Sequence, residues 1–171
     1  MLELRSYQAE DAREILRWTK GEYAFRQWCA DRFAKYPIDE TIFQQYYDEM
    51  ARRGERFWPI TAVHPDKGIV GHFMIRTVDQ ENHVLRFGFV IVNDALRGCG
   101  MGKEMLKKGL VYTFQRLGAK KVTLGVFENN RPALECYLSV GFTPIPNMDT
   151  IHYCIMGETW GCIEMEIALP E

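Results

Sequence analysis

The sequence predicts an α/β (α+β) fold in which one mixed sheet of six or seven strands carries helices on both faces. The apolar patterns follow the order strand, helices, three strands, helix, strand, helix, strands, which departs from the strict βαβ repetition of doubly wound nucleotide-binding folds. The 171 residues are 47% hydrophobic, which is enough for a sizeable core, and they contain no repeat or long linker. We therefore expect a single domain over residues 1–171.

The N-terminal third is predicted to begin with one strand and to continue as helices. Alternation of apolar and charged residues indicates a strand at residues 2–6. Residues 22–54 are typical of two helices that are broken near Tyr36-Pro37, the second beginning at residues 38–40 and ending at Gly54. Between the strand and these helices, the acidic pair Glu10-Asp11 opens an amphipathic helix that carries Ala12, Ile15, Leu16 and Trp18.

The middle of the chain predicts a hairpin, a central strand and a long helix. Two apolar runs, residues 58–63 and 69–75, flank turn residues and form the hairpin. Val84 to Val92 is apolar on both alternating faces apart from Arg86, as expected of a central strand. A helix follows from about Gly100 to Leu117, with an apolar stripe of Leu106, Leu110, Phe114 and Leu117.

The C-terminal third predicts a strand, a short helix and a final hairpin. Residues 121–127 form the strand. Asn130 is expected to cap the helix, with Pro132 in its first turn and Gly141 at its end. Residues 151–156 and 160–169 then form two strands that turn at Gly157-Glu158, and the second of them alternates apolar with polar residues.

Charge and cysteine usage exclude several classes of partner. The formal net charge is −2 and no Lys/Arg run exceeds two residues, so the basic surface that nucleic-acid binding requires is not expected. Five cysteines without a CxxC pair and four scattered histidines fit neither a disulfide framework nor a metal site. No signal-peptide pattern or long apolar stretch appears, so we expect a cytoplasmic protein that does not bind membranes.

A glycine-rich turn joins the predicted central strand to the long helix. Gly98, Gly100 and Gly102 permit unusual φ values, so that successive N–H groups can converge on an anion at the positive end of the helix. Arg97 can add a charge-assisted contact. The glycines alone are equally compatible with a plain connecting turn. A Rossmann fingerprint would need a glycine where Lys103 stands, and a P-loop would need Ser or Thr where Glu104 stands, so neither nucleotide-binding motif is present.

Two motifs together resemble the GNAT superfamily of acetyl-CoA-dependent N-acetyltransferases. The pyrophosphate-loop pattern R/Q-x-x-G-x-G/A is matched from Arg97 to Gly102, and N-x-x-A-x-x-x-Y-x-x-x-G-F is matched from Asn130 to Phe142. The resemblance implies a mostly antiparallel sheet whose fourth and fifth strands splay apart around the cofactor. It also implies an acetyl-CoA site formed by Val90, Ile91, Val92, Arg97, Gly98, Cys99, Gly100, Met101, Gly102 and Asn130.

The resemblance further implies transfer of an acetyl group to a primary amine by direct transfer in a ternary complex, with Tyr137 as the general acid that protonates the leaving thiolate. From spacing alone a core position would be favoured for Tyr137, because Ala133, Cys136 and Val140 share its helical face. Cys99 has no histidine near it in sequence and is expected to serve through its backbone N–H. No metal is implied.

The general base and the acceptor stay open at this stage. Many relatives use a glutamate on the fourth strand, but residues 84–92 contain no carboxylate. A non-catalytic acyl-CoA-binding sensor is therefore the alternative function. Carboxylates elsewhere that could act through water are Glu22, Asp79, Glu128 and Glu164.

The acceptor is expected to be a small-molecule or peptide amine, and the strand edges of the final hairpin make a homodimer possible. Aromatic and acidic side chains between the first strand and the hairpin could hold a cationic amine, although ordinary core and surface positions are favoured for them. These side chains are Tyr23, Trp28, Asp31, Tyr46, Tyr47 and Asp48.

Overall fold

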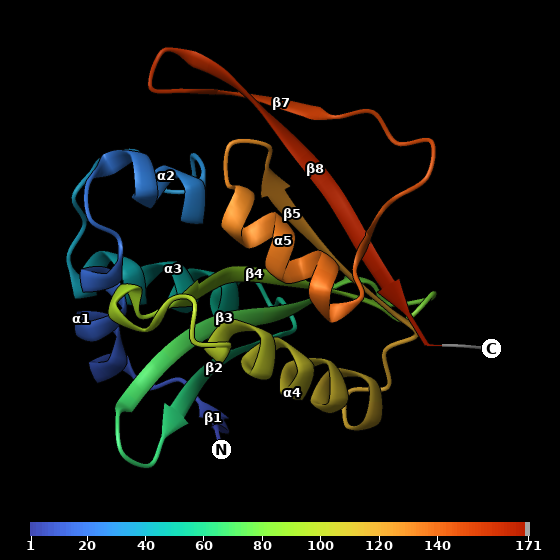
Figure 1. The fold of residues 1–171 in the computed structure, drawn as a ribbon, viewed down its shortest axis with the longest axis horizontal. Helices are drawn as coiled ribbons and strands as arrows, with labels where there is room; N and C mark the ends of the chain where they lie inside the picture. The colour runs from blue at the N-terminus through green and yellow to red at the C-terminus, as the bar shows by residue number, and fades with distance from the viewer. Residues whose placement is uncertain (170–171) are drawn as a thin grey trace.

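The computed structural model describes residues 1–169, so the last two residues of the predicted domain lie outside it. One eight-stranded sheet runs through the molecule in the order β1-β2-β3-β4-β5-β8-β6, with β7 paired to β8 (Figure 1). The strands are β1 (Glu3–Ser6), β2 (Phe57–His64), β3 (Gly68–Asp79), β4 (Val84–Val92), β5 (Lys121–Phe127), β6 (Thr143–Pro144), β7 (Ile151–Ile155) and β8 (Glu158–Ala168).

The mixed sheet confirms the predicted fold class. Within residues 1–169, β4 and β5 are the one parallel pair and the other strand pairs are antiparallel. The eighth strand is the two-residue β6, which was not predicted because two residues are too short for alternation to register.

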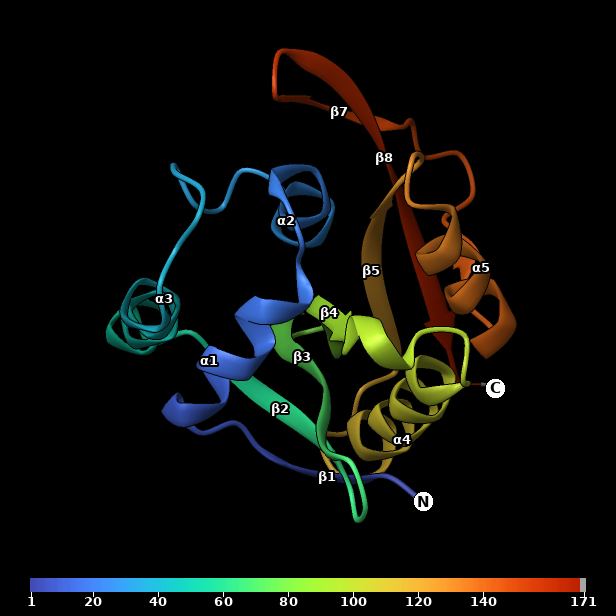
Figure 2. The same ribbon diagram turned by 60° about the vertical axis from the view of Figure 1, so that its left-hand side comes forward.

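Helices cover both faces of the sheet (Figure 2). One face carries the first three helices, whose aromatic residues pack on Met74, Phe89 and Ile91, and the other carries the last two, which pack on Phe73 and Phe87. The helices are α1 (Ala12–Ile15), α2 (Glu22–Cys29), α3 (Glu40–Arg52), α4 (Met101–Gln115) and α5 (Arg131–Val140). No helix among residues 1–169 has both the length and the apolar character needed to cross a bilayer.

The single amphipathic helix predicted after Glu10-Asp11 is wrong in detail. The chain forms the four-residue α1 between two 3₁₀ turns, at residues 9–11 and 16–18. The Asp11 carboxylate is drawn inward, where it accepts hydrogen bonds from Arg5 (2.7 and 2.8 Å) and from Thr61 (2.7 Å). Burial alone would raise the pKa of Asp11, but these hydrogen bonds outweigh it and lower that pKa. This anchor ties the turn to β1 and β2.

Helix caps form where the sequence places them. Asp39 caps α3 by accepting from the Ile42 N–H at 2.9 Å. Gly141 ends α5 in the left-handed region, at φ 116°. The long helix α4 ends at Gln115, two residues before the predicted Leu117, and it approaches β3 closely because Gly109 lies against the Phe73 ring.

Candidate active site

A cleft opens where β4 and β5 separate. The two strands pair only through Val84 to Arg86 on β4 and Lys121 to Thr123 on β5. Beyond Arg86, a bulge centred on Phe89, which has φ 50°, bends β4 away. The resulting cleft has a volume of about 680 Å³ and is lined by residues 86–92 of β4 and 124–126 of β5. The edge of β4 that faces the cleft therefore has no strand partner.

The glycine loop lies at one end of this cleft. Gly98 and Gly100 adopt φ values of 77° and 78°, and no atom lies within 4 Å of a Cβ placed on either. Glycine is therefore favoured at both positions by the positive φ value, since a side chain would meet no neighbouring atom. Gly102 differs, because it lies in the first turn of α4 and a Cβ on it would make ordinary contacts with Val92 and Cys136. Gly100 is the N-cap of α4, so unpaired N–H groups of the first turn face this end of the cleft.

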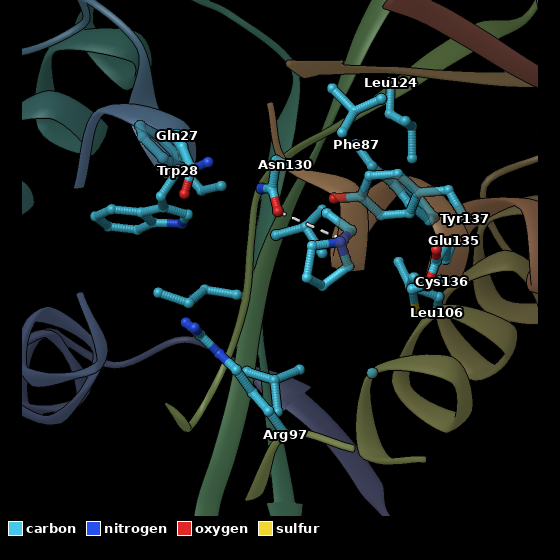
Figure 3. Close-up of a pocket in the computed structure, with 18 of the residues that line it drawn as sticks. Gln27, Trp28, Phe87, Arg97, Leu106, Leu124, Asn130, Glu135, Cys136 and Tyr137 are labelled. Atoms are coloured by element: carbon cyan, nitrogen blue, oxygen red, sulfur yellow. Dashed lines mark hydrogen bonds between the residues drawn. The ribbon is translucent and has the colours of Figure 1, made fainter. Parts of the chain in front are cut away.

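Arg97 and Lys103 supply positive charge beside the loop. Both line the cleft. Arg97 extends across it toward the N-terminal helices, where its Nη2 lies 3.4 Å from the Trp18 carbonyl oxygen (Figure 3). Met101 also lines the cleft, whereas Cys99 is exposed and does not, so its thiol is not part of the cleft wall.

Tyr137 projects from α5 into the cleft. Its side chain is only 7% exposed, and its ring packs edge-on against Phe142 with centroids 6.2 Å apart. Figure 3 shows the hydroxyl pointing toward Asn130 and the interior of the cleft, and no hydrogen bond to it from the described residues is formed. Burial raises the pKa of Tyr137, so the phenol carries its proton at neutral pH.

Asn130 both caps α5 and lines the cleft. It is the N-cap of α5, where its Oδ1 accepts from the Ala133 N–H at 3.4 Å (Figure 3). It also lines the cleft between β5 and Tyr137. The cap orients the first turn of α5 and thereby holds Tyr137, seven residues further along, on the face that meets the cleft.

The second helix closes the end of the cleft opposite the glycine loop. Gln27 of α2 donates from Nε2 to the backbone oxygen and the Oδ1 of Asn129, both at 3.1 Å. Trp28 lies beside it, and Arg32, just after α2, places its guanidinium carbon 5.3 Å from the centre of the Phe89 ring. The Gln27–Asn129 contact therefore connects α2 to the segment after β5 across the opening between β4 and β5.

The six aromatic and acidic residues considered for holding a cationic amine mostly take the ordinary core and surface positions that were favoured for them. Of the six, only Trp28 lines the cleft. Tyr47 is buried, and its hydroxyl makes a 2.7 Å hydrogen bond with Nε2 of His72. Tyr46 packs on Phe89 and Tyr23 packs on Trp160 outside the cleft, while Asp31 and Asp48 are exposed. Packing against neighbours places five of the six outside the cleft, and only Trp28 is left at its wall.

The four carboxylates considered as bases also lie outside the cleft lining. Glu22 pairs with Arg26 at 3.3 Å, and Asp79 accepts from Asn82 in an exposed turn. Glu164 pairs with Arg86 through Nη2–Oε1 at 3.0 Å and a second, shorter contact. The fourth, Glu128, lies after β5 at the surface. Among the described residues, the only carboxylate that lines the cleft is Glu135 of α5.

The Arg86–Glu164 pair crosses β5 to join β4 to β8. A Cβ on Gly125 would lie 2.8 Å from Arg86 Nη2 and 2.9 Å from Glu164 Oε1, so only glycine leaves room for the pair at this point. The side chains of Arg86 and Glu164 are 19% and 8% exposed. The pair spans the strands at the point where the cleft begins.

Several lining residues were missed from the sequence, namely Thr19, Gln27, Arg32, Lys103, Glu135 and Ser139. Lys103 had a usable signal, because it directly follows the glycine loop in the first turn of α4. The others had none that a local pattern could supply. Within the described residues there is no group of three or more His, Cys, Asp or Glu side chains placed to hold a metal ion.

Comparisons with known proteins identify a family for this chain. A model of the Acetyltransferase (GNAT) family matches residues 12–142. An SPbeta prophage-derived uncharacterized N-acetyltransferase of Bacillus subtilis, YokL, is 30% identical over 108 residues, which span 63% of this chain and 59% of that protein's length.

Solved structures share the fold over nearly the whole chain. The spermidine N-acetyltransferase of Vibrio cholerae in complex with CoA and spermine is 18% identical, covers 98% of this chain and 95% of its own, and gives a TM-score of 0.79. The dodecameric structure of the same enzyme in an intermediate state, also 18% identical, gives 0.74 with 98% and 93% covered. At this identity the likeness establishes the fold.

Proposed function

The chain belongs to the acetyltransferase (GNAT) family, and we propose that it transfers an acetyl group from acetyl-CoA to a primary amine. The observation that carries the proposal is the cleft itself. A helix N-terminus with free N–H groups stands at one end, an unpartnered strand edge runs along the cleft, and a protonated tyrosine lies inside.

The residues present fit acetyl-CoA in shape and chemistry. The loop N–H groups from Gly98 to Gly102, with Arg97 and Lys103, would hold the pyrophosphate. The open edge of β4 at Val90 to Val92 offers backbone groups to the amides of the pantetheine arm. The cleft volume of about 680 Å³ falls within the range of small-molecule sites.

In the proposed reaction the acceptor nitrogen forms a C–N bond to the acetyl carbon while the C–S bond breaks. Tyr137 donates its proton from Oη to the departing sulfur, and the proton lost by the nitrogen returns to Tyr137 through water. The raised pKa of Tyr137 keeps it in the protonated form that this step requires. With Glu135 as the one cleft-lining carboxylate of the described chain, positioning of a neutral amine carries most of the proposed catalysis.

Binding of acetyl-CoA is expected to raise the melting temperature. At a ligand concentration of 100 times Kd the gain is about 2.7 kcal/mol, which corresponds to roughly 5–10 °C for a chain of this size. Arg97→Ala should weaken binding by about 10-fold, because a charge-assisted contact to phosphate is lost. Differential scanning fluorimetry and calorimetric titration measure both effects.

The control for this prediction is Arg116→Ala, which removes an exposed arginine at the far end of α4 and should leave binding unchanged. Stabilisation by ATP or NAD but not by acetyl-CoA would contradict the proposal. Acetyl-CoA binding without thiol release across a broad amine panel would favour the non-catalytic sensor instead.

A small-molecule or peptide amine remains the proposed acceptor. The Vibrio cholerae neighbour is named for spermidine and is bound to spermine in its structure. Whether a polyamine suits this chain depends on the charges around its own cleft, which are described below. A homodimer remains a prediction that light scattering can test.

A further inference from the structure

Three arginines gather on the face of the sheet that α2 and α3 cover. Arg76 of β3 lies directly opposite Arg86 of β4 in the antiparallel register. Arg32 approaches from the segment after α2 and lies over the Phe89 ring, next to the bulge of β4. Arg32 and Arg86 both line the cleft, on the side opposite the α4 and α5 helices, and Arg76 lies beside Arg86 just outside that lining. The cluster therefore lies where an acceptor would meet the cleft from the α2 side.

The charges in this cluster are not balanced. Glu164 pairs with Arg86, but within residues 1–169 neither Arg32 nor Arg76 forms an ion pair. Arg76 is half-buried, and like charges opposite one another on a sheet are destabilising. Burial lowers the pKa of Arg76 most, and the positive charges of Arg86 and Arg32 lower it further. Tyr46 and Glu55 raise this pKa, but by less. A half-buried guanidinium held beside two others is a costly arrangement without a counter-ion.

The neighbouring cleft wall also offers a donor without an acceptor. The indole Nε1 of Trp28 is buried and has no hydrogen-bond partner. Figure 3 shows this nitrogen on the side of the ring that faces the cleft. The one cleft-lining carboxylate of the described residues, Glu135, projects from α5, on the opposite side of the sheet. The α2 side of the cleft thus presents cations and N–H donors. Glu164 is there but is paired with Arg86, and among the described residues no carboxylate on this side lines the cleft to attract a polycation.

We propose that the acceptor is an amino-acid-like molecule, whose primary amine reaches the cleft while its carboxylate is held by Arg32 and Arg76. The inference rests on the proposed function, and it narrows the acceptor class. Arg32 already donates one hydrogen bond, from Nη1 to the Cys29 carbonyl oxygen at 3.3 Å. A carboxylate would supply acceptor oxygens for its other N–H groups, for Arg76 and for the Trp28 N–H, and it would neutralise the excess charge. Spermidine-like polyamines are predicted to be poor acceptors, since their added positive charge would meet the same arginines.

The direct test compares amine acceptors with and without a carboxylate. Thiol release is measured with a panel of free amino acids, the matching amino-acid amides, and spermidine. The free acids are expected to have kcat/KM values on the order of 10- to 100-fold above their amides, as for a hydrogen-bonded charge. Equal values for acids and amides, or a preference for spermidine, would overturn the inference while leaving acetyl transfer established.

Arg76→Gln tests the cluster itself, with Arg116→Gln as the matched control outside the cleft. The acid-to-amide ratio should fall to near one in Arg76→Gln and stay at the native value in Arg116→Gln. The melting temperature of Arg76→Gln should be unchanged or higher, because a like-charge contact is removed. A lower melting temperature with an unchanged ratio would assign Arg76 a structural role only.

Binding of the product separates this inference from the proposed function. Calorimetric titration of N-acetylated amino acids, with their amides for comparison, needs no turnover. If the acids bind in an Arg76-dependent way but no acceptor is acetylated, the carboxylate site stands and the acetyltransferase proposal fails. If acetylation occurs but neither product form is favoured, the carboxylate site is refuted.

Discussion

Tyr137→Phe is expected to lower kcat by on the order of 100- to 1,000-fold, the range in which positioned proton donors contribute. The Kd for acetyl-CoA should change little, because the hydroxyl is directed at the reacting sulfur in the proposed complex and not at the phosphates. Phenylalanine keeps the edge-on packing against Phe142, so the melting temperature should also be retained. Steady-state thiol release and calorimetric titration provide the two readouts.

Tyr112→Phe is the matched control, since Tyr112 lies on α4 and faces away from the cleft lining. The pH profile adds an independent check. Because burial raises the pKa of Tyr137 above its ordinary value of 10.0, the phenol should stay protonated, and kcat should not fall through its ionisation below that pH. A native kcat in Tyr137→Phe, or a Tyr137-dependent loss of activity at a lower pH, would contradict the assignment.

The elements that hold the cofactor site could be predicted from the sequence because their signals are local. The bounds of β4 and β5 follow from short apolar runs between turn residues, and the α5 caps from Asn130 and Gly141. Gly98 and Gly100 adopt the positive φ values that their position suggests. Each of these features depends on a few consecutive residues, so a local sequence pattern is enough to predict it.

The α2 side of the cleft could not be predicted in the same way. The segment from residue 22 to 54 is crowded with aromatics, and which of them face the cleft depends on how α2 and α3 pack on β4. Tyr47 is turned inward by its hydrogen bond to His72, whereas Trp28 is left at the cleft wall. Both residues are aromatic and lie in the same aromatic-rich segment, so only the packed structure distinguishes the buried one from the one at the cleft wall.

The strand register carries information that no local pattern contains. Arg86 stands out in the sequence as the one charge in an apolar strand, but its meaning depends on Arg76 opposite it and on Glu164, 78 residues away. Gly125 is a partial signal for the pair, since a glycine in a central strand often marks close approach by other groups. The fourth strand thus carries an arginine and no glutamate, and the carboxylate that pairs with this arginine comes from Glu164 on β8.

Glu164→Ala is expected to destabilise the protein by about 2–3 kcal/mol, below the value for a fully buried pair because Arg86 retains 19% exposure. The substitution leaves Arg86 facing Arg76 with no counter-ion, at the point where β4 and β5 begin to separate. Chemical denaturation measures the loss. Glu164→Gln keeps the volume and one hydrogen-bond acceptor, so it should cost less than the alanine variant.

A double-mutant cycle distinguishes a specific ion pair from general packing. If the loss arises from the orphaned Arg86 charge, Arg86→Met combined with Glu164→Met should recover at least half of the stability that Glu164→Met loses alone. Removing both charges also relieves Arg76, which adds to the recovery. Additive losses in the cycle would show that the two side chains act independently. In that case the opening of the cleft would be fixed by the Phe89 bulge, and the pair across Gly125 would not contribute to it.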